Sequence, residues 1–250
     1  MNLNIKDRWA LVTGASKGIG RAIAMELAKE GARVILAART QEKLESVRAE
    51  MVEPEKHRCV TVDLMAEGGV ARLAAAIEPL GPLDIMVHNL GGSAMVFQPL
   101  APSEDWKKVW QFNVGIAHEL NRIFIPPMAA RKWGRVVHLS TLSTITYNGY
   151  AAYVAAKCAL NGYVKTVSRD VSKDNVIVSA LAPGAIYSEG RFFAKMQQED
   201  PAALENYFKE HLPIKRLGQA AEVAPVAAFL CSEHASYMAG SIVGVDGGGN

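Results

Sequence analysis

Short apolar runs, many of them rich in β-branched residues, alternate along the chain with longer segments of helical periodicity. The run WALVTG (9–14) reads as a strand and is followed by an amphipathic segment, 18–30, in which Ile19, Ile23 and Leu27 recur at helical spacing. The same alternation predicts further strands at 33–38, 58–64, 83–90, 134–140, 175–184 and 241–248, and helices at 41–53 and 150–173. The strands are apolar on both faces, as parallel strands buried between helices are.

This order of elements predicts an α/β fold of Rossmann type, a doubly wound parallel sheet of about seven strands with helices on both faces. Such folds bind ligands at the carboxyl ends of their strands. No linker-like stretch divides the chain, so we expect residues 1–250 to form a single domain for dinucleotide binding and catalysis. The mixed apolar and charged stretch 186–218 is expected to form short amphipathic helices that act as a substrate lid.

Composition narrows the class of protein. Half of the 250 residues are hydrophobic and 21% are charged, which is ordinary for a globular protein. The net charge of +2 gives no argument for a nucleic-acid or membrane partner. Three irregularly spaced cysteines argue against a disulfide framework or a metal site, and no apolar run is long enough to cross a bilayer. We therefore expect a soluble, cytoplasmic protein without a metal.

The segment TGASKGIG places Gly14, Gly18 and Gly20 between the first strand and the first helix. Glycines in that position permit a tight turn and close approach of the backbone to a phosphate, while the helix N-terminus supplies free N–H groups. The spacing differs from the G-x-G-x-x-G fingerprint, so position rather than spacing carries the argument. The loop predicts a dinucleotide site.

The end of the second predicted strand bears on the choice of dinucleotide. A carboxylate there would bind the ribose hydroxyls of NAD, but no acidic residue occurs before Glu42. Lys17 in the glycine loop and Arg39 at the strand end are suited instead to the 2′-phosphate of NADP. Either cation alone would be read as a solvated surface charge; the two together favour NADP(H).

The segment YNGYAAYVAAK contains three tyrosines and one lysine. Within a helix, Tyr153 and Lys157 are one turn apart and share a face, whereas Tyr150 is two turns from the lysine and Tyr147 precedes the helix. A cation beside Tyr153 would lower the pKa of its hydroxyl and make it a general acid or base. Such a pair is also common in ordinary packing, so its weight comes from the dinucleotide loop that precedes it.

Together these motifs resemble the short-chain dehydrogenase/reductase family, in its single-domain branch, and within it the 3-oxoacyl-acyl-carrier-protein reductases. TGASKGIG is similar to the family's cofactor loop and YVAAK to its Tyr-x-x-x-Lys motif. The resemblance implies the catalytic set Asn113, Ser140, Tyr153 and Lys157, with Ser140 placed 13 residues before Tyr153. It implies cofactor contacts from Gly14, Ser16, Lys17, Gly18, Ile19, Gly20, Arg39, Asp63, Leu64, Asn89, Gly91, Tyr153, Lys157, Pro183, Gly184, Ile186 and Ser188.

The resemblance implies hydride transfer between the nicotinamide ring and a carbonyl carbon. Tyr153 would give or take the proton, and Ser140 would hydrogen-bond the oxygen as charge develops, with Ser143 and Thr144 as weaker rivals. Lys157 would hold the nicotinamide ribose, and Asn113 would support it through a water. Departures from the family pattern are Leu90 beside the cofactor, and His88 and His138, which we expect to be structural and buried.

Substrate and assembly follow less directly from the motifs. A 3-oxoacyl thioester ranks first, docked through a carrier protein by Arg131, Lys132, Arg169 and Lys173, ahead of a free hydrophobic, steroid, sugar or secondary-metabolite ketone. An NADP-binding regulatory protein and a sugar-nucleotide epimerase or dehydratase remain alternatives. The resemblance also implies a homotetramer, to which Ala155, Ala156 and Ala159 would contribute a close helix contact. Pro126 and Pro127 predict a helix kink.

Overall fold

Seven parallel strands form one sheet in the computed structural model, which describes residues 1–190 and 192–249. The strand order is β3-β2-β1-β4-β5-β6-β7, so the direction of winding reverses between β1 and β4. The strands are β1 (Trp9–Thr13), β2 (Arg33–Ala38), β3 (Arg58–Thr61), β4 (Leu83–His88), β5 (Gly134–Leu139), β6 (Val176–Pro183) and β7 (Ile242–Val245). The Rossmann-type fold predicted from the alternation of elements is confirmed.

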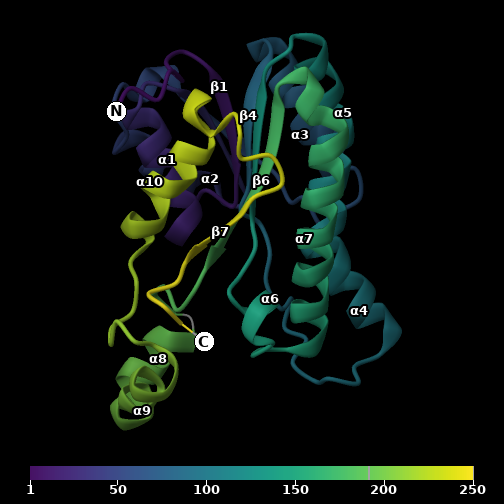
Figure 1. Cartoon of the computed structure of the whole chain (residues 1–250). Coiled ribbons are helices and arrows are strands. Elements are labelled where there is room, and N and C mark those ends of the chain that lie inside the picture. The colour runs from purple at the N-terminus through teal and green to yellow at the C-terminus, as the bar shows by residue number, and fades with distance from the viewer. Residues whose placement is uncertain (191, 250) are drawn as a thin grey trace.

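Helices cover both faces of this sheet (Figure 1). The α-helices are α1 (Gly18–Lys29), α2 (Gln41–Ala49), α3 (Gly69–Ile77), α4 (Ser103–Trp110), α5 (Ile116–Ala130), α6 (Ser143–Thr146), α7 (Ala151–Val171), α8 (Phe192–Glu199), α9 (Pro201–His211) and α10 (Ala220–Leu230). The buried clusters place α1, α2 and α10 on one face and α3, α5 and α7 on the other. Among the described helices, none combines the length and apolar character needed to cross a bilayer.

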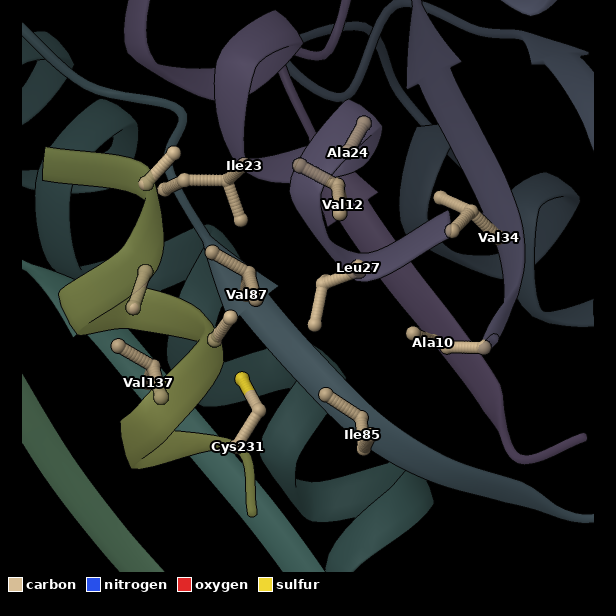
Figure 2. Packing of buried hydrophobic residues seen from close by; sticks show 14 of the residues in the cluster. Ala10, Val12, Ile23, Ala24, Leu27, Val34, Ile85, Val87, Val137 and Cys231 are labelled. Atoms are coloured by element: carbon tan, nitrogen blue, oxygen red, sulfur yellow. The ribbon is translucent and has the colours of Figure 1, made fainter. Parts of the chain in front are cut away.

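The core consists of two apolar layers separated by the sheet. Because successive strand residues point to opposite faces, Ala10 and Val12 of β1 pack toward α1 and α10, while Leu11 packs toward α3 and α5. In β5, Val137 belongs to the first layer and Val136 to the second. Figure 2 shows the first layer, where side chains of α1 and α10 meet β1, β4 and β5. Both faces of each central strand are therefore buried, as its apolar sequence predicts.

Several boundaries differ from the sequence-based expectation. The third strand ends at Thr61 rather than at residue 64, because its partner β2 ends at Ala38 and the pairing stops there. The second helix ends at Ala49, and Pro54 begins a separate 3₁₀ turn. Helix α5 includes both of its prolines, and a π-helical turn at Gln111–Gly115, which no sequence signal predicted, joins it to α4.

Helices α8 and α9 form the excursion after β6 that the mixed stretch 186–218 predicts, apart from Arg191, which lies outside the described residues. Asp200 separates the two helices and caps α9 by accepting a hydrogen bond from the N–H of Ala203 at 3.0 Å. Their apolar side chains form a separate cluster with the chain on either side. The cluster contains Ala185, Tyr187, Phe193, Met196, Leu204, Tyr207, Phe208, Leu212 and Leu217.

Leu27 of α1 is fully buried between the helix and the sheet, so truncating it tests this packing (Figure 2). Leu27→Ala should lower the free energy of unfolding by about 2–5 kcal/mol, because the lost contacts leave a cavity that neighbours fill only in part. Leu100→Ala is the matched control, since Leu100 is 94% exposed and should change stability little. Urea unfolding followed by circular dichroism measures both, and equal losses would contradict the packing described.

Candidate functional site

A hydrogen-bonded clamp joins the ends of β1 and β4, where the winding reverses. The Thr13 hydroxyl accepts hydrogen bonds from the N–H groups of Asn89 (3.1 Å) and Leu90 (3.2 Å). The Asn89 side-chain amide donates in return to the carbonyls of Thr13 (3.0 Å) and Gly14 (3.2 Å). Asn89 therefore fixes the start of the glycine loop against the neighbouring strand.

Two of the three loop glycines adopt conformations that other residues avoid, and the third permits close packing. Gly14 and Gly18 have φ values of 66° and 58°. Gly20 is buried in the first turn of α1, where a Cβ atom would collide with the Asn89 amide and the Gly14 carbonyl. Gly20 thus shapes the loop from behind and, unlike the other two glycines, does not line the cleft.

A cleft of about 560 Å³ runs along the carboxyl ends of the strands. All of the predicted site residues line it except Gly20 and Asn113. It is lined from the predicted set by Gly14, Ser16, Lys17, Gly18, Ile19, Arg39, Asp63, Leu64, Asn89, Gly91, Ser140, Tyr153, Lys157, Pro183, Gly184, Ile186 and Ser188. Leu90, which we expected beside the cofactor, and Phe193, from the expected lid, also line the cleft. Sequence reasoning missed Ala37, Ala38, Thr40, Lys43, Val62, Met65, Phe112, Leu139 and Thr141.

One end of the cleft carries exposed positive charge. Lys17, Arg39 and Lys43 line it and form no ion pair with a carboxylate of the described chain. The nearby first turn of α1 contains no acidic residue, so the helix N-terminus adds to the positive potential. The sequence signal for Lys43 is its place in the first turn of α2, directly after the end of β2. These features fit a dinucleotide that carries an additional phosphate.

The Lys157 side chain is almost fully buried and points to the carboxyl end of β5. Its Nζ donates a hydrogen bond to the Leu139 carbonyl at 2.5 Å. Burial lowers the pKa of this ammonium to about 8, because few groups replace its lost hydration. A Cβ atom at position 91 would lie 3.0 Å from Nζ, so Gly91 leaves the room that the lysine needs.

Tyr153 lines the cleft beside Lys157, but its titration differs from the expectation. Lys157 Nζ is 6.0 Å from the centroid of the Tyr153 ring, as the helical spacing predicts. Burial nevertheless raises the pKa of Tyr153, while a side-chain hydrogen bond with Thr141 lowers it in part. The prediction that Lys157 lowers this pKa is wrong for this structure, because burial dominates and the ammonium is directed at Leu139.

The other two tyrosines of the segment lie away from the cleft lining. Tyr150 precedes α7, is 41% exposed and contacts Phe97 with ring centroids 4.8 Å apart. Tyr147 is 73% exposed and has a positive φ of 55° after α6. Of the three tyrosines, Tyr153 is therefore the one that the fold brings to the cleft with Lys157.

Asn113 lies behind the cleft in the π-helical turn. Its Nδ2 donates to the carbonyls of Gly92 and Val109, each at 2.8 Å, and its Oδ1 accepts from the Gly92 N–H at 3.0 Å. The side chain therefore holds the Gly91–Gly92 loop against Lys157. Its predicted support of Lys157 through a water stays a prediction.

Ser140 lies at the end of β5 as predicted, but its hydroxyl points to α7. Its Oγ donates to Asn161 Oδ1 at 2.7 Å, and the residue is 5% exposed. The adjacent Thr141 lines the cleft together with Tyr153. The sequence offered no signal for the Asn161 contact, which depends on how α7 packs.

Two histidines stack beneath the cleft at the ends of β4 and β5, and both are buried as expected. The rings of His88 and His138 are 4.5 Å apart and share Asn121, which lies 2.8 Å from His88 Nε2 and 3.3 Å from His138 Nε2. Burial lowers the pKa of His88 to about 4 and also lowers that of His138, so both are neutral near pH 7. Among the described residues, none hydrogen-bonds the Nδ1 of His138.

Comparisons with known proteins agree with this geometry. A family model described as enoyl-(acyl carrier protein) reductase matches residues 14–250. The 3-oxoacyl-[acyl-carrier-protein] reductase of Aquifex aeolicus is 32% identical, with the alignment covering 99% of each chain. The chain belongs to the short-chain dehydrogenase/reductase family, and is an oxidoreductase of that class.

Solved structures show how varied its relatives are. The L-sorbose reductase of Gluconobacter frateurii, solved with NADPH and L-sorbose, superposes with a TM-score of 0.91 at 32% identity, covering 99% of this chain and 98% of that one. A 7α-hydroxysteroid dehydrogenase complexed with NADH and an oxo bile acid has a TM-score of 0.88 at 29% identity, covering 99% and 96%. Members of this class thus act on small molecules of quite different chemistry.

The buried histidines predict that acid destabilises the protein. Unfolded His88 takes up a proton below about pH 6.5, whereas folded His88 stays neutral until about pH 4. Stability should therefore fall as pH decreases across this window, with His88 alone contributing about 2 kcal/mol between pH 6.5 and 5. Urea unfolding at both pH values should show that His88→Asn loses less free energy of unfolding between pH 6.5 and 5 than the wild type. The control His118→Asn, at an exposed position on α5, should lose as much as the wild type. An equal loss in His88→Asn and the wild type would contradict the assignment.

Proposed function

We propose that this protein interconverts a ketone and a secondary alcohol with NADP(H) as its cofactor. The observation that carries the proposal is that one cleft brings Tyr153 and Lys157 together with the glycine loop and the cations Lys17 and Arg39. A regulatory protein that merely binds NADP would not need the pair of Tyr153 and Lys157.

The chain's own residues would divide binding and proton transfer between them. Lys17, Arg39 and Lys43 would hold the 2′-phosphate, and the glycine loop the pyrophosphate. Lys157 would hold the nicotinamide ribose with the ammonium hydrogens that the Leu139 carbonyl does not take. The bound cofactor supplies the hydride. Tyr153, kept protonated near neutral pH by its raised pKa, would donate a proton to the reduced oxygen.

The choice of substrate rests on the apolar part of the cleft lining that α8 supplies. Phe193 lines the cleft and belongs to the apolar cluster of α8 and α9. These helices would close over a largely apolar substrate. We rank a 3-oxoacyl thioester first, ahead of a free hydrophobic, steroid, sugar or secondary-metabolite ketone, because the relative from Aquifex aeolicus is named for that activity.

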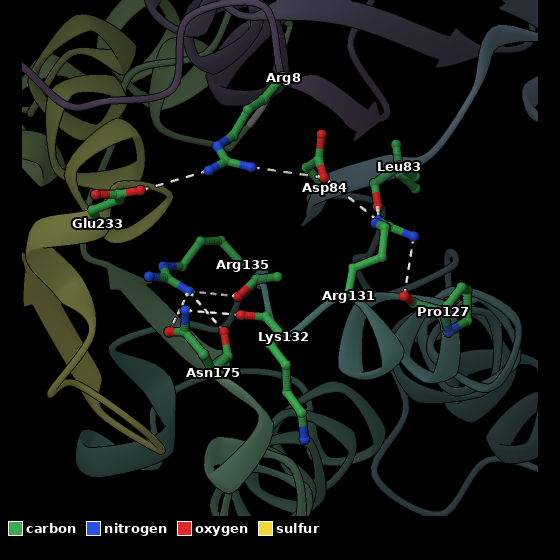
Figure 3. Close-up of polar contacts among 10 residues, drawn as sticks. Arg8, Leu83, Asp84, Pro127, Arg131, Lys132, Arg135, Asn175 and Glu233 are labelled. Carbon is green, nitrogen blue, oxygen red and sulfur yellow. Dashed lines mark hydrogen bonds and ion pairs between the residues drawn. The ribbon is translucent and has the colours of Figure 1, made fainter.

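Docking of an acidic carrier protein would rest on fewer free cations than the sequence implies. Arg131 Nη2 donates to the Leu83 carbonyl at 2.6 Å and lies 3.4 Å from the Asp84 carboxylate (Figure 3). Lys132 pairs with Asp174. Both lie at the amino-terminal end of β5, away from the cleft. This arrangement favours a small thioester or free ketone over a docked carrier, whose remaining contacts would be Arg169 and Lys173.

Assembly and location complete the proposal. Ala155 is exposed and Ala159 half-buried on α7, which supports a close helix contact in a homotetramer, whereas Ala156 packs inside its own subunit. Trp106 and Trp110 of α4 are partly exposed and would add apolar area. Three free cysteines suit a reducing compartment, which for this protein would be the cytoplasm.

Replacing the proton donor tests the reaction class. In a screen that follows NADPH oxidation over ketones and 3-oxoacyl thioesters, wild-type protein should turn over at least one substrate class. Tyr153→Phe should then lower kcat by two to four orders of magnitude, on the order of what a general acid contributes. Tyr150→Phe is the matched control and should keep measurable turnover. Normal turnover in Tyr153→Phe would rule out this mechanism.

Removing one cation tests the choice of cofactor. Arg39→Ala should weaken NADPH binding about tenfold or more, because a charge-assisted contact with the 2′-phosphate is lost, and should leave NADH binding nearly unchanged. Arg122→Ala, at an exposed position of α5 outside the cleft, serves as the control. Fluorescence titration gives the dissociation constants. Equal wild-type affinities for NADPH and NADH would refute the preference for NADP(H).

A further inference from the structure

Two hydroxyl residues, Ser140 and Thr141, follow β5 and line the cleft, and either could contact a substrate oxygen. Side chains of a strand alternate between its faces, and Val136 of β5 packs on the layer that contains α7. Ser140, four residues later, continues on that face. The Ser140 N–H still pairs with the Leu181 carbonyl of β6 at 2.7 Å, so the alternation extends to this residue. The fold thereby directs the Ser140 side chain toward α7.

The Ser140 hydroxyl is part of a chain of hydrogen bonds that ties the following loop to α7. Ser140 Oγ donates to Asn161 Oδ1 at 2.7 Å, the usual length for a hydroxyl donor. Asn161 Nδ2 donates to the Thr144 hydroxyl at 3.0 Å, and that hydroxyl donates to the Thr141 carbonyl at 2.9 Å. A hydroxyl has one hydrogen to donate, and that of Ser140 is already directed at the Asn161 side-chain oxygen.

The Thr141 hydroxyl is placed differently. Its hydrogen-bond partners in the described chain are the Ser143 hydroxyl and N–H, both at 3.3 Å. These two contacts are long for a hydroxyl, so little holds its hydrogen to Ser143. Thr141 and Tyr153 both line the cleft, so a substrate oxygen bound beside the Tyr153 hydroxyl would face Thr141 as well.

We propose that Thr141 is the catalytic hydroxyl that binds the substrate oxygen beside Tyr153, and that Ser140 is a positioning residue that holds the Thr141 loop through Asn161. This inference rests on the proposed function and replaces the role predicted for Ser140 from its spacing to Tyr153. Thr141 was not among the rivals considered from sequence, because it matches no motif at that spacing.

The step assigned to Thr141 leaves it chemically unchanged. Hydride addition to the carbonyl carbon moves the electron pair of the C=O π bond onto the oxygen. Tyr153 transfers its hydroxyl proton to that oxygen, giving the alcohol. Thr141 donates a hydrogen bond to the same oxygen while negative charge develops, and so stabilises the transition state more than the ground state. The dinucleotide is oxidised and the carbonyl is reduced, which balances the reaction.

Hydroxyl removal at each position separates the two roles. Thr141→Val keeps the shape of the side chain and should lower kcat on the order of 100-fold with little change in NADPH affinity, as removal of an oxyanion donor does. Thr141→Ser restores the hydroxyl and should recover most of that loss. Ser140→Ala should cost less in kcat than Thr141→Val and lower the midpoint of thermal unfolding. Thr141→Val with wild-type kcat, or a larger loss in Ser140→Ala, would overturn the assignment.

A second readout needs neither cofactor nor substrate. With tyrosine labelled by ¹³C at Cζ, the NMR resonance of Tyr153 is the one that is missing from the Tyr153→Phe spectrum. Its chemical shift as a function of pH gives the midpoint at which the Tyr153 hydroxyl loses its proton. Thr141→Val should raise that midpoint, because the hydrogen bond that stabilises tyrosinate is gone, whereas Ser140→Ala should not. An unchanged midpoint in Thr141→Val would overturn this inference. A wild-type protein that reduces no carbonyl would instead overturn the proposed function.

Discussion

The site depends first on the hydrogen-bonded junction between β1 and β4. After β1 and after β4 the chain continues toward opposite sides of the sheet, so the loops that follow these two parallel strands leave a crevice between the strand ends. The hydrogen bonds between Thr13 and Asn89 fix the bottom of that crevice. With the Asn89 amide occupying the space behind the loop, positions 14 and 20 leave no room for a Cβ atom. The shape of the glycine loop is thus a consequence of strand pairing as much as of its own sequence.

Burial of one ammonium organises the opposite wall of the cleft. Lys157 can be accommodated because the Leu139 carbonyl accepts its hydrogen bond and Gly91 leaves space. Asn113 in turn fixes the glycine pair that provides this space, from a π-helical turn in which its Nδ2 also donates to the Val109 carbonyl. A buried cation with a depressed pKa is poorly satisfied, and a ribose hydroxyl of the proposed cofactor would give it a further acceptor. Binding of that cofactor would then relieve a cost that folding imposes.

Much of the site follows from local sequence, and the rest depends on packing. Strand alternation and the glycine loop are local signals. The fold was therefore predicted correctly, and Gly14, Lys17 and Arg39 line the cleft as expected. Helical spacing likewise selected Tyr153 and Lys157. The direction of a hydroxyl depends on a partner elsewhere in the chain, so the Asn161 contact of Ser140 was not predictable. The same holds for the pKa of Tyr153, because burial is set by segments that meet only in the folded chain.

The excursion that carries α8 and α9 leaves and rejoins the sheet at a single point. The N–H of Tyr187 donates to the Gly218 carbonyl at 2.8 Å, and the N–H of Gly218 donates to the Ala185 carbonyl at 2.9 Å. The Ile214 N–H, also in the excursion, donates to the Gly247 carbonyl just after β7 at 3.3 Å. Because α8 and α9 form their own apolar cluster, substitutions within it could reshape the part of the cleft that Phe193 lines while the pairing of β6 and β7 stays in place.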